Sequence, residues 1–149
     1  MGQSTRHSIN ELLVNLFNHV MDMGGKAVIT SQFQDITNND MHIIEAIGVE
    51  EPRNMSVIAH RMAVTVSTLT TNMNGLERKG YIRRERSQED KRVVYVLLTD
   101  KGRKAFYHHR DFHKKMIKAI VKDLSEEEME ILYRCLQNLN QFLEPEGTT

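Results

Sequence analysis

The chain of 149 residues contains one cysteine, two prolines and no tryptophan. A single cysteine, Cys135, excludes an internal disulfide framework and fits a reducing compartment. Because proline occurs only at Pro52 and Pro145, long helices are permitted elsewhere. No run approaches the roughly 18 consecutive apolar residues of a membrane-spanning helix, and the N-terminus has no signal-peptide pattern. We therefore expect a cytoplasmic protein without membrane contact.

Signatures of common enzymes are missing as well. The chain has no P-loop, no GxSxG motif, no dinucleotide-binding glycine pattern and no HExxH motif. Its paired acids have simpler explanations, because Glu50 and Glu51 fit a loop and the acids at 126–128 fit the start of a helix, where they complement the helix dipole. The sequence does not predict an enzyme.

Charge is balanced in total but uneven along the chain. The chain has 20 basic and 20 acidic residues. Between Arg53 and Lys104 there are 12 Lys and Arg against 5 Asp and Glu, and the remainder has 8 against 15. A basic segment between acidic flanks is typical of a nucleic-acid-binding surface. Charge alone leaves a merely solvated surface as an alternative.

The hydrophobic pattern predicts a mainly α-helical fold with a small β-hairpin. Apolar residues at helical spacing predict helices at 9–20, 37–47, 55–62, 65–79, from 99 onward and after the Ser125 cap. Alternating runs at 81–86 and 93–98, separated by the polar stretch 87–92, predict the hairpin. Helix, turn, helix and hairpin in this order predict a winged helix-turn-helix at 37–99, with helical dimerisation and effector regions at 1–36 and 100–149.

The helix from Thr65 to Lys79 has an unusual outer face. Its apolar stripe should face the core, whereas the opposite side is small, polar and nearly uncharged. Such residues have poor helix propensity, but short side chains allow close approach to a DNA major groove and can reach base edges. The alternative is a poor helix that is buried on both sides.

The hairpin is basic and contributes the second half of the predicted DNA-binding surface. Arg92 is the candidate for insertion into a narrow A·T minor groove, and Asp90 is placed to orient its guanidinium. The residues predicted to contact DNA are Ser67, Thr68, Thr71, Asn72, Arg78, Arg84, Arg86, Asp90, Lys91 and Arg92.

The last predicted helix has an apolar seam. Its seam residues step by three and four, as in the a and d positions of a short coiled coil, which favours a homodimer interface over burial within the same chain. These residues are Met129, Leu132, Leu136, Leu139 and Leu143.

Several strings resemble the multiple-antibiotic-resistance regulator (MarR) family. They lie at 64–70, 76–84, 90–92 and 97–102, and the resemblance extends over about residues 9–143. It implies a homodimer with interlaced terminal helices and one winged helix-turn-helix on each arm. Shorter strings at 41–45, 64–71, 112–114 and 141–144 look like the fatty-acid-synthesis repressor (FabT) subgroup. That narrower resemblance implies repression of fatty-acid synthesis genes with long-chain acyl-acyl carrier protein as corepressor.

An acyl chain would need an adaptable apolar tunnel, and nine methionines suit that requirement. For each lining residue, plain core packing is the competing explanation. The candidates for the effector pocket are Phe17, Met21, Phe33, Met41, Ile44, Phe106, His109, His113 and Ile117.

His113 stands four positions after His109, a spacing at which two histidines on one helix can share a metal. No Asp, Glu or Cys stands at a matching spacing, so we predict no metal ligands and expect these histidines to hydrogen-bond across the effector pocket or the dimer. Cys135 has no neighbouring His or paired Cys and is expected to be inert.

Together these features predict a homodimeric repressor that binds an A·T-rich pseudopalindrome and has no cofactor. The narrower resemblance implies that its effector is an acyl-acyl carrier protein or a fatty acyl ligand. Two alternatives stay open, a repressor released by a small aromatic ligand and a metal-dependent regulator.

Overall fold

The computed structural model describes residues 2–22 and 33–144, with only the backbone at residues 20–22. Residues 1–111 form one compact unit and residues 112–149 a second, and helix α5 runs through the boundary between them. The helices are α1 (Gly2–Asp22), α2 (Asn38–Ile47), α3 (Met55–Met62), α4 (Val66–Arg78), α5 (Asp100–Val121) and α6 (Glu126–Leu143). The strands are β1 (Arg53–Asn54), β2 (Ile82–Arg86) and β3 (Val94–Leu98).

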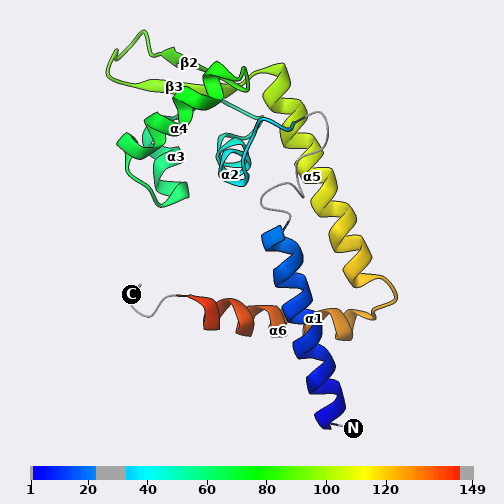
Figure 1. Ribbon diagram of the computed structural model, residues 1–149. Coiled ribbons are helices and arrows are strands. Elements are labelled where there is room, and N and C mark those ends of the chain that lie inside the picture. Colours follow the sequence, from blue (N-terminus) through cyan, green and yellow to red (C-terminus); the bar gives the residue numbers. More distant parts are fainter. Residues whose placement is uncertain (1, 23–32, 145–149) are drawn as a thin grey trace. The chain divides into compact units, whose positions relative to one another are not determined.

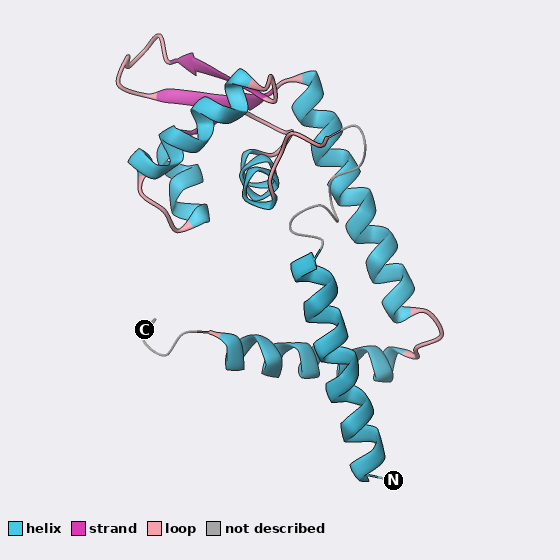
Figure 2. Cartoon of the chain, viewed as in Figure 1, coloured by secondary structure: helices cyan, strands magenta, loops and turns pink. Residues whose placement is uncertain are grey.

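The predicted fold class is confirmed: the chain is mainly helical with a small antiparallel sheet (Figures 1 and 2). Among the described residues, no helix combines the length and the apolar character that crossing a membrane requires.

Local signals in the sequence set the helix boundaries. Thr37 caps α2, because its hydroxyl accepts from the Asp40 amide at 3.1 Å and the Asp40 carboxylate accepts from the Thr37 amide at 3.0 Å. Ser125 and Glu128 form the same reciprocal pair at the start of α6. Gly48 ends α2 with a φ of 71°, where a side chain would be strained. The predicted cap at Ser125 is therefore confirmed, and Thr37 caps α2 in the same way.

The turn between α3 and α4 contains a left-handed residue that is not glycine. Ala63 has a φ of 53° and ψ of 42°, and the amide of Val64 donates to the Ala59 carbonyl across the turn. This bond satisfies a carbonyl at the end of α3 and turns the chain toward α4. An L-residue pays a steric penalty in this conformation.

The sheet has three strands in the order β1-β3-β2, one more than the hairpin pattern predicts. In the hairpin, Ile82 pairs with Leu98 and Arg86 pairs with Val94. The additional strand, β1, has only two residues and pairs Arg53 with Val96. Two residues are too few to show an alternating pattern, so the sequence gives no signal for β1. The strand forms because it pairs with β3, which lies far along the chain.

One apolar core joins α2, α3, α4 and the sheet, which lie together in Figure 1. Periodicity predicts that Val66, Leu69, Met73 and Leu76 of α4 face the core. Leu69, Met73 and Leu76 are buried, whereas Val66, in the first turn of the helix, is 45% exposed. The remaining core residues are Phe33, Ile36, Met41, Ile43, Ile44, Ile47, Met55, Ile58, Ala59, Tyr81, Ile82, Val96, Leu98 and Ala105.

The start of α5 packs directly on Tyr81, the residue that precedes β2. The Thr99 amide donates to the Tyr81 carbonyl at 3.0 Å, and Gly102 lies so close to that carbonyl that a Cβ would be 2.1 Å from its oxygen. Only a glycine fits at this contact. It permits the close approach, and the Thr99 bond holds the first turn of α5 against Tyr81.

In the second unit, α6 has no buried residue. Met129, Leu136 and Leu143 of the predicted seam are exposed, and Leu132 and Leu139 are half-buried. In α1, which belongs to the first unit, Leu13 is half-buried, whereas Leu12 is 61% and Leu16 57% exposed.

Candidate nucleic-acid interface

Helix α4 presents a polar outer face opposite its buried stripe. Thr65 caps the helix, since its hydroxyl accepts from the Thr68 amide at 3.1 Å. Ser67, Thr68 and Thr71 are exposed, and the threonine hydroxyl of Thr71 donates back to the Ser67 carbonyl at 3.4 Å. Short hydroxyl side chains at the N-terminal half of a helix are therefore available to an external partner.

The structure separates the two asparagines of this helix. Asn72 is half-buried at the flank, whereas Asn74 is exposed and follows Ser67 and Thr71 at helical spacing, with Arg78 one turn further. Sequence reasoning selected Asn72 and overlooked Asn74. The steps of four, three and four residues from Ser67 onward were the available signal.

Arg84 projects from β2 toward α4 rather than into solvent. Its Nε donates to Glu77 Oε2 at 3.0 Å, and its Nη2 donates to Glu77 Oε1 at 3.2 Å and to Asn74 Oδ1 at 2.8 Å. The side chain is 26% exposed. The hydrogen bond from Arg84 holds the pKa of the Glu77 carboxyl below its ordinary value and raises the pKa of Arg84 itself. The pair therefore fastens the wing to the helix.

The tip of the wing carries exposed positive charge. Arg92 donates from Nε to Asp90 Oδ1 at 3.1 Å and from Nη2 to Asp90 Oδ2 at 3.2 Å, a two-pronged contact. The Arg92 side chain is 90% exposed, and the bond holds the pKa of the Asp90 carboxyl below its ordinary value. Lys91 and Arg86 are also exposed. An exposed pair contributes little stability, about 0–1 kcal/mol, so its effect is to orient Arg92.

A polar cluster anchors the C-terminal end of α4. The buried Tyr81 hydroxyl donates to Asp35 Oδ1 at 2.5 Å, and Lys101 Nζ lies 3.5 Å from Asp35 Oδ2 and 4.3 Å from the centre of the Tyr81 ring. Lys79 pairs with Asp40 at 3.2 Å. The Tyr81 bond lowers the pKa of Asp35, whereas burial and the Asp35 carboxylate raise the pKa of Tyr81. These contacts, which no spacing rule predicts, fix the position of the C-terminal end of α4.

The proposed effector residues do not share one environment. Phe33, Met41 and Ile44 belong to the core, Phe106 packs on its edge and His109 is buried. By contrast Phe17, His113 and Ile117 are exposed, and the Met21 side chain lies outside the described residues.

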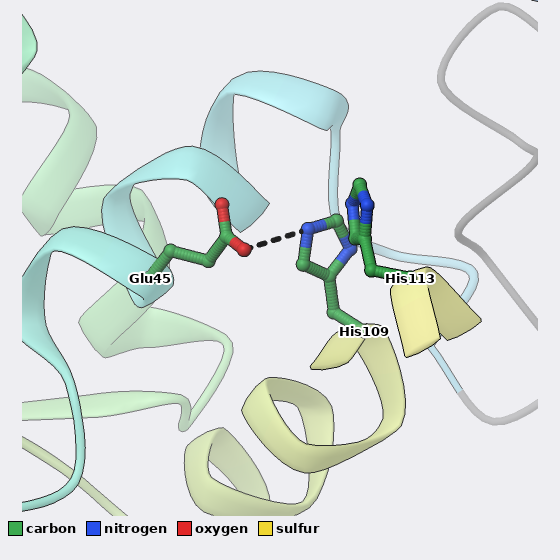
Figure 3. A group of neighbouring side chains, drawn as sticks. All are labelled: Glu45, His109 and His113. Atoms are coloured by element: carbon green, nitrogen blue, oxygen red, sulfur yellow. Dashed lines mark ion pairs between the residues drawn. The ribbon is translucent and has the colours of Figure 1, made fainter. Parts of the chain in front are cut away.

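The structure supplies a carboxylate partner that the sequence spacing did not reveal. Glu45 Oε1 of α2 lies 2.9 Å from His109 Nε2 of α5, and His113 follows His109 by one turn of the same helix (Figure 3). An Asp or Glu four residues from a histidine is readable from sequence, but a carboxylate on another helix is not.

Comparisons with known proteins agree with this geometry. The MarR family model matches residues 36–94. FabT of Streptococcus pneumoniae, solved in complex with DNA, is 42% identical with a TM-score of 0.77, covering 93% of this chain and 96% of that chain. The HTH-type transcriptional regulator PchR of Bacillus subtilis is 28% identical over 99% of this chain and 95% of its own length.

A mutant of S. aureus MepR bound to an oligodeoxyribonucleotide is 25% identical, with a TM-score of 0.60 over 91% of this chain and 98% of that chain. With a capped recognition helix, a basic wing and these relatives, the chain belongs to the MarR family and is a DNA-binding transcriptional regulator, not an enzyme.

Proposed function

We propose that this regulator is a homodimeric repressor of fatty-acid biosynthesis genes and that long-chain acyl-acyl carrier protein is its corepressor. The observation that carries the proposal is the 42% identity to FabT over 93% of the chain. It agrees with the short strings that resemble the fatty-acid-synthesis repressor subgroup. DNA binding itself rests on the family and does not depend on this effector.

The proposed operator is an A·T-rich pseudopalindrome. In a dimer, two copies of α4 enter successive major grooves about one turn of DNA apart, so each half-site repeats the same sequence in inverted order. The threonine methyl groups at Thr68 and Thr71 suit thymine methyls, and Arg92 suits a narrow A·T minor groove.

The proposed dimer is supported by apolar surface that one chain leaves exposed. Leu136 of α6 is 54% exposed, and Leu16 of α1 is 57% exposed. Leu136→Asp is expected to shift the mass measured by light scattering from dimer to monomer, because a charge would be buried in the interface. Asn138→Asp adds the same charge at a polar position and should remain dimeric. A wild-type chain that is monomeric at micromolar concentration contradicts the proposal.

The effector is tested by a titration of labelled duplex carrying the promoter of a fatty-acid synthesis gene. The expected result is tighter binding with long-chain acyl-acyl carrier protein than with the carrier protein that has no acyl chain. Equal affinity with both contradicts the corepressor but leaves DNA binding intact. Release of the duplex by a small aromatic acid instead would favour the aromatic-ligand alternative.

A metal-dependent regulator is the second candidate, and Glu45 is the observation that favours it. A carboxylate 2.9 Å from one of two histidines on the same helix face supplies donor types that Zn²⁺ accepts. In this case a chelator should lower DNA affinity and added Zn²⁺ should restore it in the wild type but not in Glu45→Gln. Metal-free protein that binds DNA equally well contradicts this candidate.

A further inference from the structure

Asn74 occupies the outward face of the recognition helix, between Thr71 and Arg78. It is exposed, and it lies opposite Leu69, Met73 and Leu76 of the core. A side chain at this position faces whatever the helix binds, and the family identifies that partner as DNA.

The amide of Asn74 has a fixed orientation. Arg84 Nη2 donates to Asn74 Oδ1 at 2.8 Å. A guanidinium carries only donors, so the Asn74 oxygen must turn toward Arg84 and its NH₂ group must turn away. Arg84 is itself held by two bonds to Glu77, at 3.0 and 3.2 Å, which prevents it from following a rotating amide.

The outward NH₂ group is available. In the described part of the chain, Asn74 Nδ2 donates no hydrogen bond. An unrestrained asparagine can turn its amide over and meet either a donor or an acceptor. The usual contact to adenine needs both amide atoms directed at the base, with the oxygen accepting from N6 and the NH₂ group donating to N7.

We propose that Asn74 is a specificity-determining residue that acts as a hydrogen-bond donor to DNA, and that Arg84 is a positioning residue that fixes this polarity. The acceptor is a base edge, namely purine N7, guanine O6 or thymine O4. A base that turns an amino group toward Asn74 is rejected, because two donors then face each other.

The test uses the full-length protein and a duplex that the wild type selects from a random-sequence library. Asn74→Asp keeps an oxygen for Arg84 but replaces the donor by a carboxylate. It is expected to weaken binding about 10- to 100-fold, as for loss of one specific contact, and Asn74→Ala should weaken it less because it adds no repulsion. Affinity of Asn74→Asp within about twofold of the wild type overturns the proposal.

Arg84→Lys keeps the charge and removes the fork, so it tests positioning separately from phosphate attraction. We expect weaker binding with an unchanged dependence on salt, and a double variant Asn74→Ala/Arg84→Lys that binds as well as Asn74→Ala alone. Effects of the two substitutions that multiply would show that Arg84 acts independently and would overturn its positioning role. Circular dichroism establishes that each variant is folded.

Changes in the duplex locate the acceptor. A base-pair change or a 7-deazapurine that weakens the wild type but not Asn74→Ala assigns the acceptor to a base edge. Sensitivity to a methylphosphonate alone would place the contact on the backbone, where it carries no sequence information, and would overturn the specificity-determining role. If every modification affects the two proteins equally, Asn74 makes no donor contact and the proposal is wrong.

Discussion

The close contact between Gly102 and Tyr81 predicts that Gly102→Ala lowers the free energy of unfolding. A Cβ at Gly102 would lie 2.1 Å from the Tyr81 carbonyl oxygen, 3.1 Å from its carbon and 3.3 Å from Leu98 Cβ. These are backbone and buried atoms, so no flexible side chain can move aside. Relief requires α5 to shift away from Tyr81, which would disturb the bond from the Thr99 amide to the same carbonyl.

Two effects oppose each other in Gly102→Ala. Alanine is favoured over glycine in a helix by about 1 kcal/mol. Overpacking usually costs about 1–3 kcal/mol, and a clash with backbone belongs at or above the upper end of that range. We therefore expect a net loss of about 2 kcal/mol in the free energy of unfolding, which for a chain of this size corresponds to a fall of about 4–8 °C in Tm.

Gly75→Ala is the matched control because it makes the same change in α4. There the nearest atom to a new Cβ is Arg78 Nη2 at 3.9 Å, an ordinary contact. Without DNA, the free energy of unfolding of this variant should be about 0.5–1 kcal/mol higher than that of the wild type. Thermal and urea unfolding, followed by circular dichroism at equal protein concentration, measures both. Wild-type stability of Gly102→Ala, or equal shifts in both variants, would refute the reasoning.

Three further predictions concern the turn, the polar cluster and the wing. Ala63→Gly should raise the unfolding free energy by about 1 kcal/mol, since glycine adopts the left-handed conformation freely; lower stability in urea unfolding would argue against a strained turn. Tyr81→Phe should lower the free energy of unfolding by about 1 kcal/mol at pH 7, because it removes the bond to Asp35. Because that bond depresses the folded-state pKa of Asp35, its stabilisation is present above the ordinary carboxyl pKa near 4 and is lost as pH falls below it. Unfolding between about pH 6 and 2 should therefore show a smaller acid-induced loss for Tyr81→Phe than for the wild type, and parallel curves would contradict the coupling. Arg92→Ala should weaken operator binding by roughly 1–3 kcal/mol and leave Tm unchanged, since the side chain is 90% exposed; unaltered affinity would reject the wing contact.

Much of the local structure could be predicted from the sequence. Thr37, Thr65 and Ser125 each cap a helix because a short oxygen-bearing side chain satisfies an amide only a few residues away. The buried face of α4 follows from its period of 3.6 residues. Interactions this close along the chain need no knowledge of the fold, which explains why the helix-turn-helix and its wing were predictable.

The tertiary structure alone decided which polar groups from distant segments of the chain meet. The pairing of β1 with β3, the bond from Tyr81 to Asp35 and the contact of Glu45 with His109 join residues far apart in the chain. Arg84 illustrates the consequence, because its sequence context predicts a DNA contact whereas its guanidinium bonds to Glu77 and Asn74. Periodicity shows which face of a helix is polar, but only packing between elements determines which atom of a side chain is left to bind a partner.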